Sequence, residues 1–260
     1  MGILNITPDS FSDGGEAMTL EGALEKAKLL IKAGAQIIDV GGESTRPFSD
    51  PVSADEEIKR VIPVIKALRE KYSDIIISVD TYKAKVAELA LKAGADMVND
   101  ISGGQFDPNI LDVVKDYQCP YILMHIKGTP KTMQINPHYN NVVDEIKQYF
   151  RERIEICLKK GIHKKNIILD PGLGFGKTFS HNLEILKHLE IFKEFDCPLL
   201  LGPSRKSFIG EIIQKPPKDR DAGTAGMAIY AYLKGVHILR VHNVSMINDA
   251  LKIFKFLWKD

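Results

Sequence analysis

Residues 75–81 read IIISVDT, a mostly apolar run that ends in polar residues, and this pattern decides the fold. Continuous Ile and Val content without regular polar alternation is typical of strands covered on both faces, as in parallel sheets. The pattern recurs as MGILN at 1–5, IIDVGGESTR at 37–46, DMVND at 96–100, YILMH at 121–125, IILDPG at 167–172, LLLGPSRK at 199–206 and ILRVH at 238–242. We therefore predict eight parallel strands.

Helical patterns lie between these runs, so strand and helix alternate along the chain, and right-handed crossovers would join the strands. A length of 260 residues is close to the roughly 250 of a barrel with eight strand–helix units. We predict an α/β fold, a (βα)8 TIM barrel, with 1–260 as a single domain. The C-terminal ends of barrel strands meet at one rim, where distant polar residues can share a site. The predicted strands lie near 2–5, 36–40, 75–79, 96–99, 120–124, 166–169, 198–201 and 237–241.

Several helix boundaries can be predicted from the sequence. Ser53 followed by Glu56 is typical of a capping box. Pro63 should kink or split the helix expected in 53–72, because proline lacks an amide hydrogen. Apolar residues in 142–158 fall on one stripe and predict an amphipathic helix against the barrel. Glycines mark three predicted helix ends: Gly34, Gly94 and Gly161.

Composition and charge argue against several classes of protein. The chain has 44% hydrophobic and 27% charged residues, as ordinary globular proteins do. A formal net charge of +1 offers no long-range attraction to nucleic acid or to an anionic membrane. The sequence has no signal-type start, no run of about 18 apolar residues and no disulfide-like spacing of its three cysteines. We expect a cytoplasmic protein with buried thiols and no membrane or nucleic-acid partner.

Asp80, Asn99 and Asp170 follow the third, fourth and sixth predicted strands. Such side chains present acceptors and an amide to a planar heterocycle, and a carboxylate can pair with a ring NH and its neighbouring amino group. Each residue could instead cap the helix that follows it. Three of them at one rim favour a site for a heterocycle.

The segment LGPSRKSFIG, 201–210, marks the change from the seventh strand to a helix, whose N-terminus would favour an anion. Lys206 could direct its ammonium group to a ring carbonyl or nitrogen, whereas Arg205 could simply belong to a solvated basic patch. Arg240 and His242 would lie on one side of the eighth strand. The histidine could be structural, but with the arginine and Asn5 on the adjacent first strand it could hold a metal-bound diphosphate.

Residues 171–178, PGLGFGKT, look like a nucleotide-binding motif, but two positions argue against one. Pro171 stands where a P-loop needs glycine, and Lys177 stands where a dinucleotide fingerprint needs its last glycine. The glycines would instead let a ligand plane approach the backbone near Phe175. The sequence also lacks HxxxH spacing and a GxSxG motif, so neither a zinc site nor a serine nucleophile is expected.

Taken together, several motifs resemble the dihydropteroate synthase family: MGILNITPDSFSDGG, GGESTRP, SVDT, ND at 99–100, MHIKGTPKTMQ, DPGLGFGK, GPSRKSFIG and RVH. The resemblance runs from Met1 to the C-terminal helix. It implies an enzyme of folate synthesis that joins a dihydropterin methyl diphosphate to p-aminobenzoate and releases diphosphate. It also implies Mg²⁺ as cofactor, a homodimer and a target of sulfonamides.

The resemblance further implies a role for each site residue. Asp13, Arg46 and Lys206 would be catalytic. The pterin would be held by Asp80, Asn99, Met124, Asp170, Phe175, Gly202 and Lys206. The p-aminobenzoate site and its lids would include Pro8, Phe11, Thr45, Arg46 and Ser207. The diphosphate would be held by Asn5, Arg240 and His242, with Asn5 also as the Mg²⁺ ligand.

A mechanism follows from the charges of this reaction. Loss of diphosphate leaves a cation on the pterin methylene, so the enzyme should stabilise both the leaving anion and the cation. The arylamine is largely neutral at pH 7 and needs positioning rather than a strong base. We expect Asp13, brought in by loop closure, to stabilise the positive charge.

Two other functions use much of the same site. A pterin-binding methyltransferase would share Asp80, Asn99 and Asp170, but the SRK and RVH motifs count against it. A non-catalytic pterin-binding protein on a retained barrel would bind without turnover. The fold alone cannot decide, because this barrel hosts many chemistries.

Overall fold

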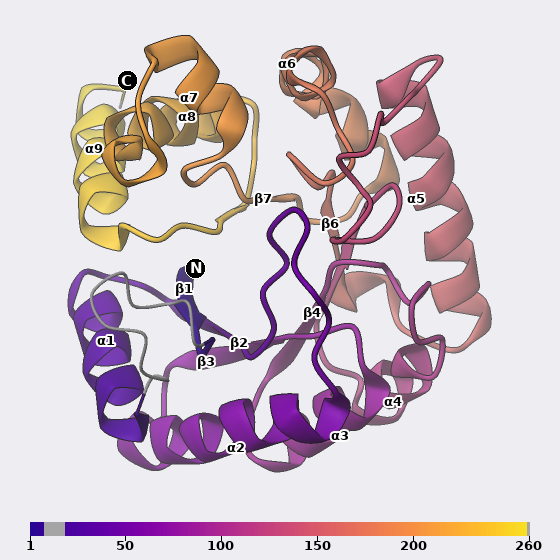
Figure 1. Cartoon of the computed structure of the whole chain (residues 1–260), viewed down its shortest axis with the longest axis vertical. Coiled ribbons are helices and arrows are strands. Elements are labelled where there is room, and N and C mark those ends of the chain that lie inside the picture. Colours follow the sequence, from indigo (N-terminus) through magenta and orange to yellow (C-terminus); the bar gives the residue numbers. More distant parts are fainter. Residues whose placement is uncertain (8–18, 259–260) are drawn as a thin grey trace.

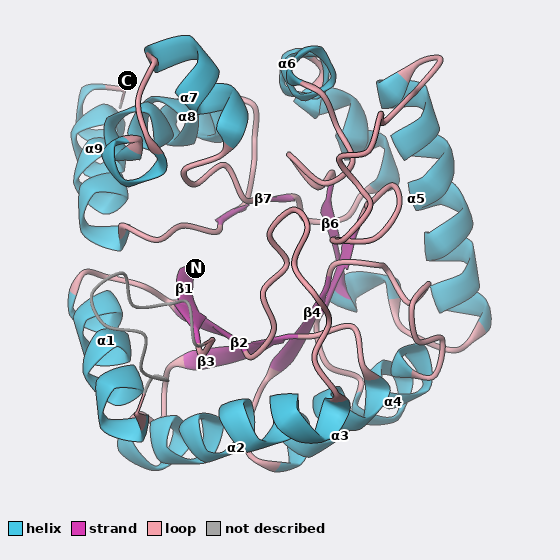
Figure 2. Ribbon diagram, viewed as in Figure 1, coloured by secondary structure: helices cyan, strands magenta, loops and turns pink. Residues whose placement is uncertain are grey.

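Short parallel strands stand at the centre of the molecule, and helices surround them (Figure 1, Figure 2). The computed structural model describes residues 1–7 and 19–258. Its strands are β1 (Gly2–Asn5), β2 (Ile37–Gly41), β3 (Ile76–Asp80), β4 (Met97–Asp100), β5 (Tyr121–Met124), β6 (Ile167–Asp170), β7 (Leu200–Leu201) and β8 (Ile238–Leu239). The strands β1 to β6 pair in sequence order, and β7 pairs with β8.

Two isolated contacts close the sheet into a barrel. Leu169 bridges to Leu199, which joins β6 to the β7 segment, and Gly2 bridges to Val241, which joins the β8 segment to β1. The Ile3 amide donates to the Val241 carbonyl at 3.0 Å. The predicted parallel α/β barrel is therefore confirmed, whereas the assignment of all of 1–260 to one domain remains a prediction. The seventh and eighth strands are both shorter than predicted. Pro198 has no amide to donate to a ladder, and the Leu199 amide donates to His237 Nδ1 at 3.1 Å instead of to a neighbouring strand.

Helices cover the outer face of the strands, as Figure 2 shows. The large hydrophobic core lies between the two layers, and a smaller cluster around Ile122 and Leu200 fills part of the barrel interior. The cysteines Cys119, Cys157 and Cys197 are buried, as predicted. The helices are α1 (Leu20–Lys32), α2 (Ala54–Lys71), α3 (Ala84–Lys92), α4 (Ile110–Tyr117), α5 (Val142–Lys159), α6 (Phe179–Lys187), α7 (Ser207–Ile213), α8 (Asp221–Leu233) and α9 (Val244–Leu257). Short 3₁₀ helices lie at Lys164–Asn166, Leu189–Phe195 and Pro217–Asp219.

The helix α2 differs from the sequence-based prediction in two respects. Ser53 caps α2 by accepting from the Glu56 amide at 3.2 Å, but the Glu56 carboxylate pairs with Arg60 instead of completing the box. Of the two effects expected at Pro63, the split is wrong, because α2 continues through it, whereas a kink there stays a prediction. Buried side chains on both sides of the proline, including Val61 and Val64, pack on the core and offset the lost hydrogen bond.

The amphipathic helix predicted over 142–158 is present as α5, and its apolar stripe is buried. The predicted glycine ends are also present, because Gly34, Gly94 and Gly161 have φ values of 95°, 110° and 92° directly after helix caps. Glycine adopts this left-handed conformation without the clash that a Cβ would cause. These ends set where each chain segment turns back towards the barrel.

Candidate active site

The register of the parallel strands places three predicted site residues side by side. Asn5 pairs with Gly41, Gly41 with Asp80, and Asp80 with Asn99. Gly41 lies between Asn5 and Asp80, and a Cβ there would stand in ordinary van der Waals contact with both, 3.4 Å from Asp80 Cβ and 3.6 Å from Asn5 Oδ1. The ends of β1, β3 and β4 therefore form one continuous polar edge.

Arg240 crosses the barrel mouth from the end of β8 to this edge. Its Nε donates to Asp39 Oδ2 and its Nη2 to Asp80 Oδ2, both at 2.6 Å. Asn99 Nδ2 donates to the same Asp39 oxygen at 3.1 Å. The structure thus joins the predicted diphosphate ligand Arg240 to two of the predicted pterin ligands.

Asp39 lies at the centre of this network, and sequence reasoning missed it. The side chain is fully buried on β2, and its second oxygen, Oδ1, is a buried atom without a hydrogen-bond partner. A signal was present, because an acid in the apolar run IIDVG of a strand covered on both faces needs a partner. The partner is far along the chain, so the sequence alone could not identify it.

Two carboxylates share the Arg240 guanidinium, and their pKa values reflect this. Burial raises the pKa of Asp80 to about 7; Arg240 opposes the shift, and Asp39 adds to it. Burial lowers the pKa of Arg240, but Asp39 and Asp80 outweigh this and raise it above the ordinary value. Asp80 can therefore change its protonation near neutral pH, whereas Arg240 stays charged.

Asp170 ends β6, where it is 5% exposed and accepts from the Gly172 amide at 2.8 Å. Burial raises the pKa of Asp170, opposed by that hydrogen bond and by the nearby cations Lys206, Lys177 and Arg240. Asp170 and Arg240 therefore lie close enough to interact electrostatically at the C-terminal ends of their strands.

The Lys206 ammonium lies 4.3 Å from the centre of the Phe175 ring, in cation–π geometry. Burial lowers the pKa of Lys206 to about 8, and Asp170 opposes this shift. Gly202, at the end of β7, has open space where a Cβ would point. Met124 and Phe175 belong to one apolar cluster at the end of β5, together with Ile101, Ile126 and Met133. An apolar wall and a cation thus stand beside the carboxylates.

His242 is held by Ser204 across the β7 and β8 ends. Ser204 Oγ accepts from the His242 amide at 3.2 Å and lies 2.9 Å from the ring Nδ1. A hydroxyl that already accepts from the amide can donate to Nδ1, which leaves Nε2 with the hydrogen. Burial, together with Arg240, lowers the pKa of His242 to about 3, so the ring is neutral at pH 7. His242 can offer an anion a hydrogen bond but no charge.

The loop 41–52 reaches across the open face of the barrel (Figure 1). Its Phe48 amide donates to the Pro130 carbonyl at 2.9 Å, and Asp50 pairs with Lys131 at 2.7 Å, so it meets the loop after β5. Thr45 is half-buried and Arg46 is exposed. The predicted lid residues Pro8, Phe11 and Asp13 lie outside the described residues.

Glu43 anchors the base of this loop, a feature that the sequence reasoning did not identify. Its carboxylate accepts from Lys83 Nζ at 2.6 Å, from the Tyr82 hydroxyl at 2.9 Å and from the Val52 amide at 2.9 Å. Lys83 also pairs with the buried Glu57. The loop that carries Thr45 and Arg46 is therefore tied at its base to the segment between β3 and α3, and through Lys83 to α2.

Lys177 and His125 form a second buried contact that the sequence did not reveal. Lys177 Nζ lies 2.9 Å from His125 Nδ1 and donates to the Phe175 carbonyl at 2.9 Å. Burial lowers the pKa of both side chains well below their ordinary values. The contact fixes the glycine-rich turn after β6 against β5, so it supports Phe175.

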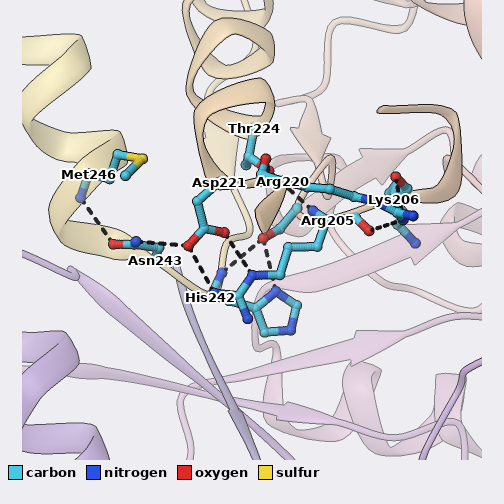
Figure 3. Close-up of polar contacts among 9 residues, drawn as sticks. Arg205, Lys206, Arg220, Asp221, Thr224, His242, Asn243 and Met246 are labelled. Carbon is cyan, nitrogen blue, oxygen red and sulfur yellow. Dashed lines mark hydrogen bonds and ion pairs between the residues drawn. The ribbon is translucent and has the colours of Figure 1, made fainter. Parts of the chain in front are cut away.

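Arg205 and Ser207, on either side of Lys206, differ in their surroundings. Arg205 forms a two-point pair with Asp221, with 2.7 Å and 2.9 Å contacts, so the alternative reading as a solvated patch is wrong (Figure 3). Ser207 begins α7 and is exposed.

Seven predicted site residues thus lie together at the C-terminal strand ends: Asn5, Asp80, Asn99, Asp170, Lys206, Arg240 and His242.

Comparisons with known proteins identify this arrangement. The family model described as pterin binding enzyme matches residues 1–242. The dihydropteroate synthase of Synechocystis is 49% identical over 260 residues, which is all of this chain and 90% of that protein.

Solved structures show the same likeness. A Yersinia pestis dihydropteroate synthase in complex with a sulfonamide drug has a TM-score of 0.94 and 44% identity, covering 98% of this chain and 92% of that one. A Xanthomonas albilineans dihydropteroate synthase with 4-aminobenzoic acid has a TM-score of 0.93 and 41% identity, covering 100% and 92%. The chain therefore belongs to the pterin-binding enzymes and, among them, to the dihydropteroate synthase family.

Proposed function

We propose that this chain joins 7,8-dihydropterin-6-ylmethyl diphosphate to p-aminobenzoate, giving 7,8-dihydropteroate and diphosphate. The observation that carries the proposal is the meeting of Asp80, Asn99, Asp170, Lys206 and Arg240 at one rim, in a chain of this family. The donors and acceptors of a pterin edge match carboxylates and an amide. Cations beside them suit an anionic leaving group.

The pterin would occupy the space between Asp170 and the Asp80–Asn99 edge. Carboxylates would accept from the ring NH and amino groups, and Lys206 would donate to a ring carbonyl or nitrogen. Met124 and Phe175 would line the apolar side of the slot, and Gly202 leaves room for the ring plane. Arg240 would hold the acids Asp39 and Asp80 in place.

The diphosphate would lie near Asn5, Arg240 and His242. Arg240 has Nη1 in addition to the atoms that bind Asp39 and Asp80, and neutral His242 would donate from Nε2. Among residues 1–7 and 19–258 there is no group of three or more His, Cys, Asp or Glu placed to hold a metal ion. Mg²⁺ commonly uses one or two protein oxygens together with phosphates and water. The Asn5 amide oxygen fits that role, and bound Mg²⁺ would neutralise diphosphate charge.

In the reaction, the bond between the methylene carbon and the diphosphate oxygen breaks, and its electron pair leaves with diphosphate. The arylamine nitrogen then bonds to the methylene and releases a proton to solvent. Arg240 would stabilise the leaving anion, and Asp13 the methylene cation. Thr45, Arg46, Ser207, Pro8 and Phe11 would position p-aminobenzoate.

A reconstitution experiment tests the activity. Purified protein, Mg²⁺, the pterin diphosphate and p-aminobenzoate should give dihydropteroate, detected by chromatography. Omitting the amine should leave only slow diphosphate release. Pterin binding without any product would favour the non-catalytic alternative, and methyl transfer from a methylated pterin would favour the methyltransferase.

We also propose that the chain forms a homodimer through α8 and α9, which pack together (Figure 1). Large apolar side chains are exposed there, including Ile253 at 65% and Phe256 at 82%. Covering such a patch would remove it from water. Light scattering should give a molecular mass of two chains. The Phe256→Glu variant should have the mass of a single chain.

The cytoplasmic location remains a prediction. Within 1–7 and 19–258, no helix combines the length and apolar character needed to cross a membrane.

A further inference from the structure

The turn between β7 and α7 sends neighbouring side chains in different directions (Figure 3). Lys206 extends to the Phe175 ring in the proposed pterin slot, and Arg205 reaches towards α8. Arg205 has φ 59°, in the left-handed region. A residue with a Cβ is disfavoured there, so surrounding contacts must hold it.

The Arg205 side chain provides one such contact. Its Nε and Nη2 donate to Asp221 Oδ1 and Oδ2 at 2.7 Å and 2.9 Å, and its backbone amide donates to Thr224 Oγ1 at 3.2 Å. Asp221 is 15% exposed, and the Arg205 side chain is 34% exposed. The two-point geometry fixes the guanidinium plane as well as its distance from α8.

Further contacts surround the same turn. Arg220 Nη1 donates to the carbonyl oxygens of Arg205 and Lys206 at 3.1 Å and 3.2 Å. Asn243 Nδ2 donates to Asp221 Oδ2 at 2.9 Å, which ties the loop after β8 to the same carboxylate. Asp221 therefore connects the turn that carries Lys206 with the segment that follows His242.

We propose that Arg205 is a positioning residue for Lys206. Its pair with Asp221 holds residue 205 in the left-handed conformation, and this conformation directs Lys206 into the pterin slot. The inference rests on the proposed role of Lys206 in binding the pterin. The Arg205 side chain itself reaches Asp221 at the start of α8, whereas Lys206 reaches the Phe175 ring.

Glycine gives a sharp test, because it adopts a positive φ without the cost that alanine incurs. Arg205→Ala loses the ion pair and keeps a Cβ, whereas Arg205→Gly loses the pair but tolerates the conformation. We expect Arg205→Ala to weaken binding of the dihydropterin methyl diphosphate about tenfold by calorimetry, and Arg205→Gly to recover several-fold of that loss. Asp221→Asn keeps the side-chain volume but removes the charge, and it should also weaken pterin binding. This variant replaces Arg205→Ala as the test if Arg205→Ala does not fold.

Gln214→Gly is the matched control, because Gln214 has φ 55° at the other end of α7. It should leave pterin affinity unchanged, although it too replaces a residue in the left-handed conformation by glycine.

Lys206→Ala separates the two proposals. If Lys206→Ala weakens binding and Arg205→Ala does not, the positioning role is wrong and the pterin site stands. If Lys206→Ala has no effect, the role of Lys206 fails, and the inference fails with it. Equal losses for Arg205→Ala and Arg205→Gly would also overturn it.

Discussion

The polar residues at the strand ends and those in the loop after β2 are held in different ways. Asp39 and Asp80 are joined to Arg240 by 2.6 Å ion pairs that cross the barrel mouth from the end of β8 to β2 and β3. Thr45 is half-buried and Arg46 is exposed, in a loop anchored mainly at its base through Glu43. The strand-end half of the site, which we propose binds the pterin ring, is therefore fixed by the barrel, whereas the half proposed for p-aminobenzoate depends on loop position. Each of the following experiments tests that contrast.

The largest effect on stability is expected at the fixed half. Asp39→Ala removes a fully buried partner of Arg240 and leaves that charge poorly balanced. Breaking a buried pair in this way costs about 3–5 kcal/mol, which urea unfolding would measure. Asp55→Ala is the control, since Asp55 pairs with Lys85 where both side chains are well exposed. It should move the urea midpoint far less than Asp39→Ala, because exposed ion pairs contribute little to stability. Equal losses in the two variants would remove the contrast.

A large effect on turnover is expected from Asp13. Asp13→Ala should lower kcat on the order of 100-fold, the size of effect seen when an electrostatic partner of a transition state is lost. Pterin affinity should change little, because the strand ends would bind the ring. Steady-state kinetics and calorimetry on the same preparation would check this. Equal losses in turnover and affinity would refute the role of Asp13.

A smaller and more selective effect is expected from Arg46. Arg46→Ala should raise KM for p-aminobenzoate about tenfold, as expected when one charged contact is lost, and leave pterin affinity and the urea midpoint unchanged. Lys131→Ala is a matched control, because Lys131 pairs with Asp50 of the same loop. A similar rise in KM in the control would assign the effect to loop position rather than to Arg46.

The smallest effect is a dependence on pH. Burial raises the pKa of Asp80 from 3.8 to about 7, so the folded protein holds this proton more tightly than the unfolded chain. The contribution of Asp80 to stability therefore falls as pH rises between these two values. Pterin affinity should change in the opposite sense, rising a few-fold from about pH 6 to about pH 7 as the carboxylate forms, below the pKa of about 8 at which Lys206 loses its charge. Asp80→Asn should flatten the affinity profile, and a flat profile in the unchanged protein would contradict the assignment.

Local sequence patterns predicted most of the barrel, but they did not predict that α2 continues through Pro63. Apolar runs and glycine ends located the strands and several helices, because those signals act within a few residues. The proline was expected to interrupt α2, but packing of Val61, Val64 and their neighbours on the core overrides that local preference. Helix propensity is a weak constraint when one face of the helix is buried.

The sequence by itself determined the alternation of strand and helix and the polar residues at the strand ends. It also carried the motifs of the family. Only the tertiary structure decided which groups are partners: Arg240 with Asp39 and Asp80, Lys177 with His125, and Arg205 with Asp221. The physical reason is that periodicity depends on near neighbours in the chain. An ion pair depends on distance in space, and closing the barrel sets that distance between residues as many as 201 positions apart.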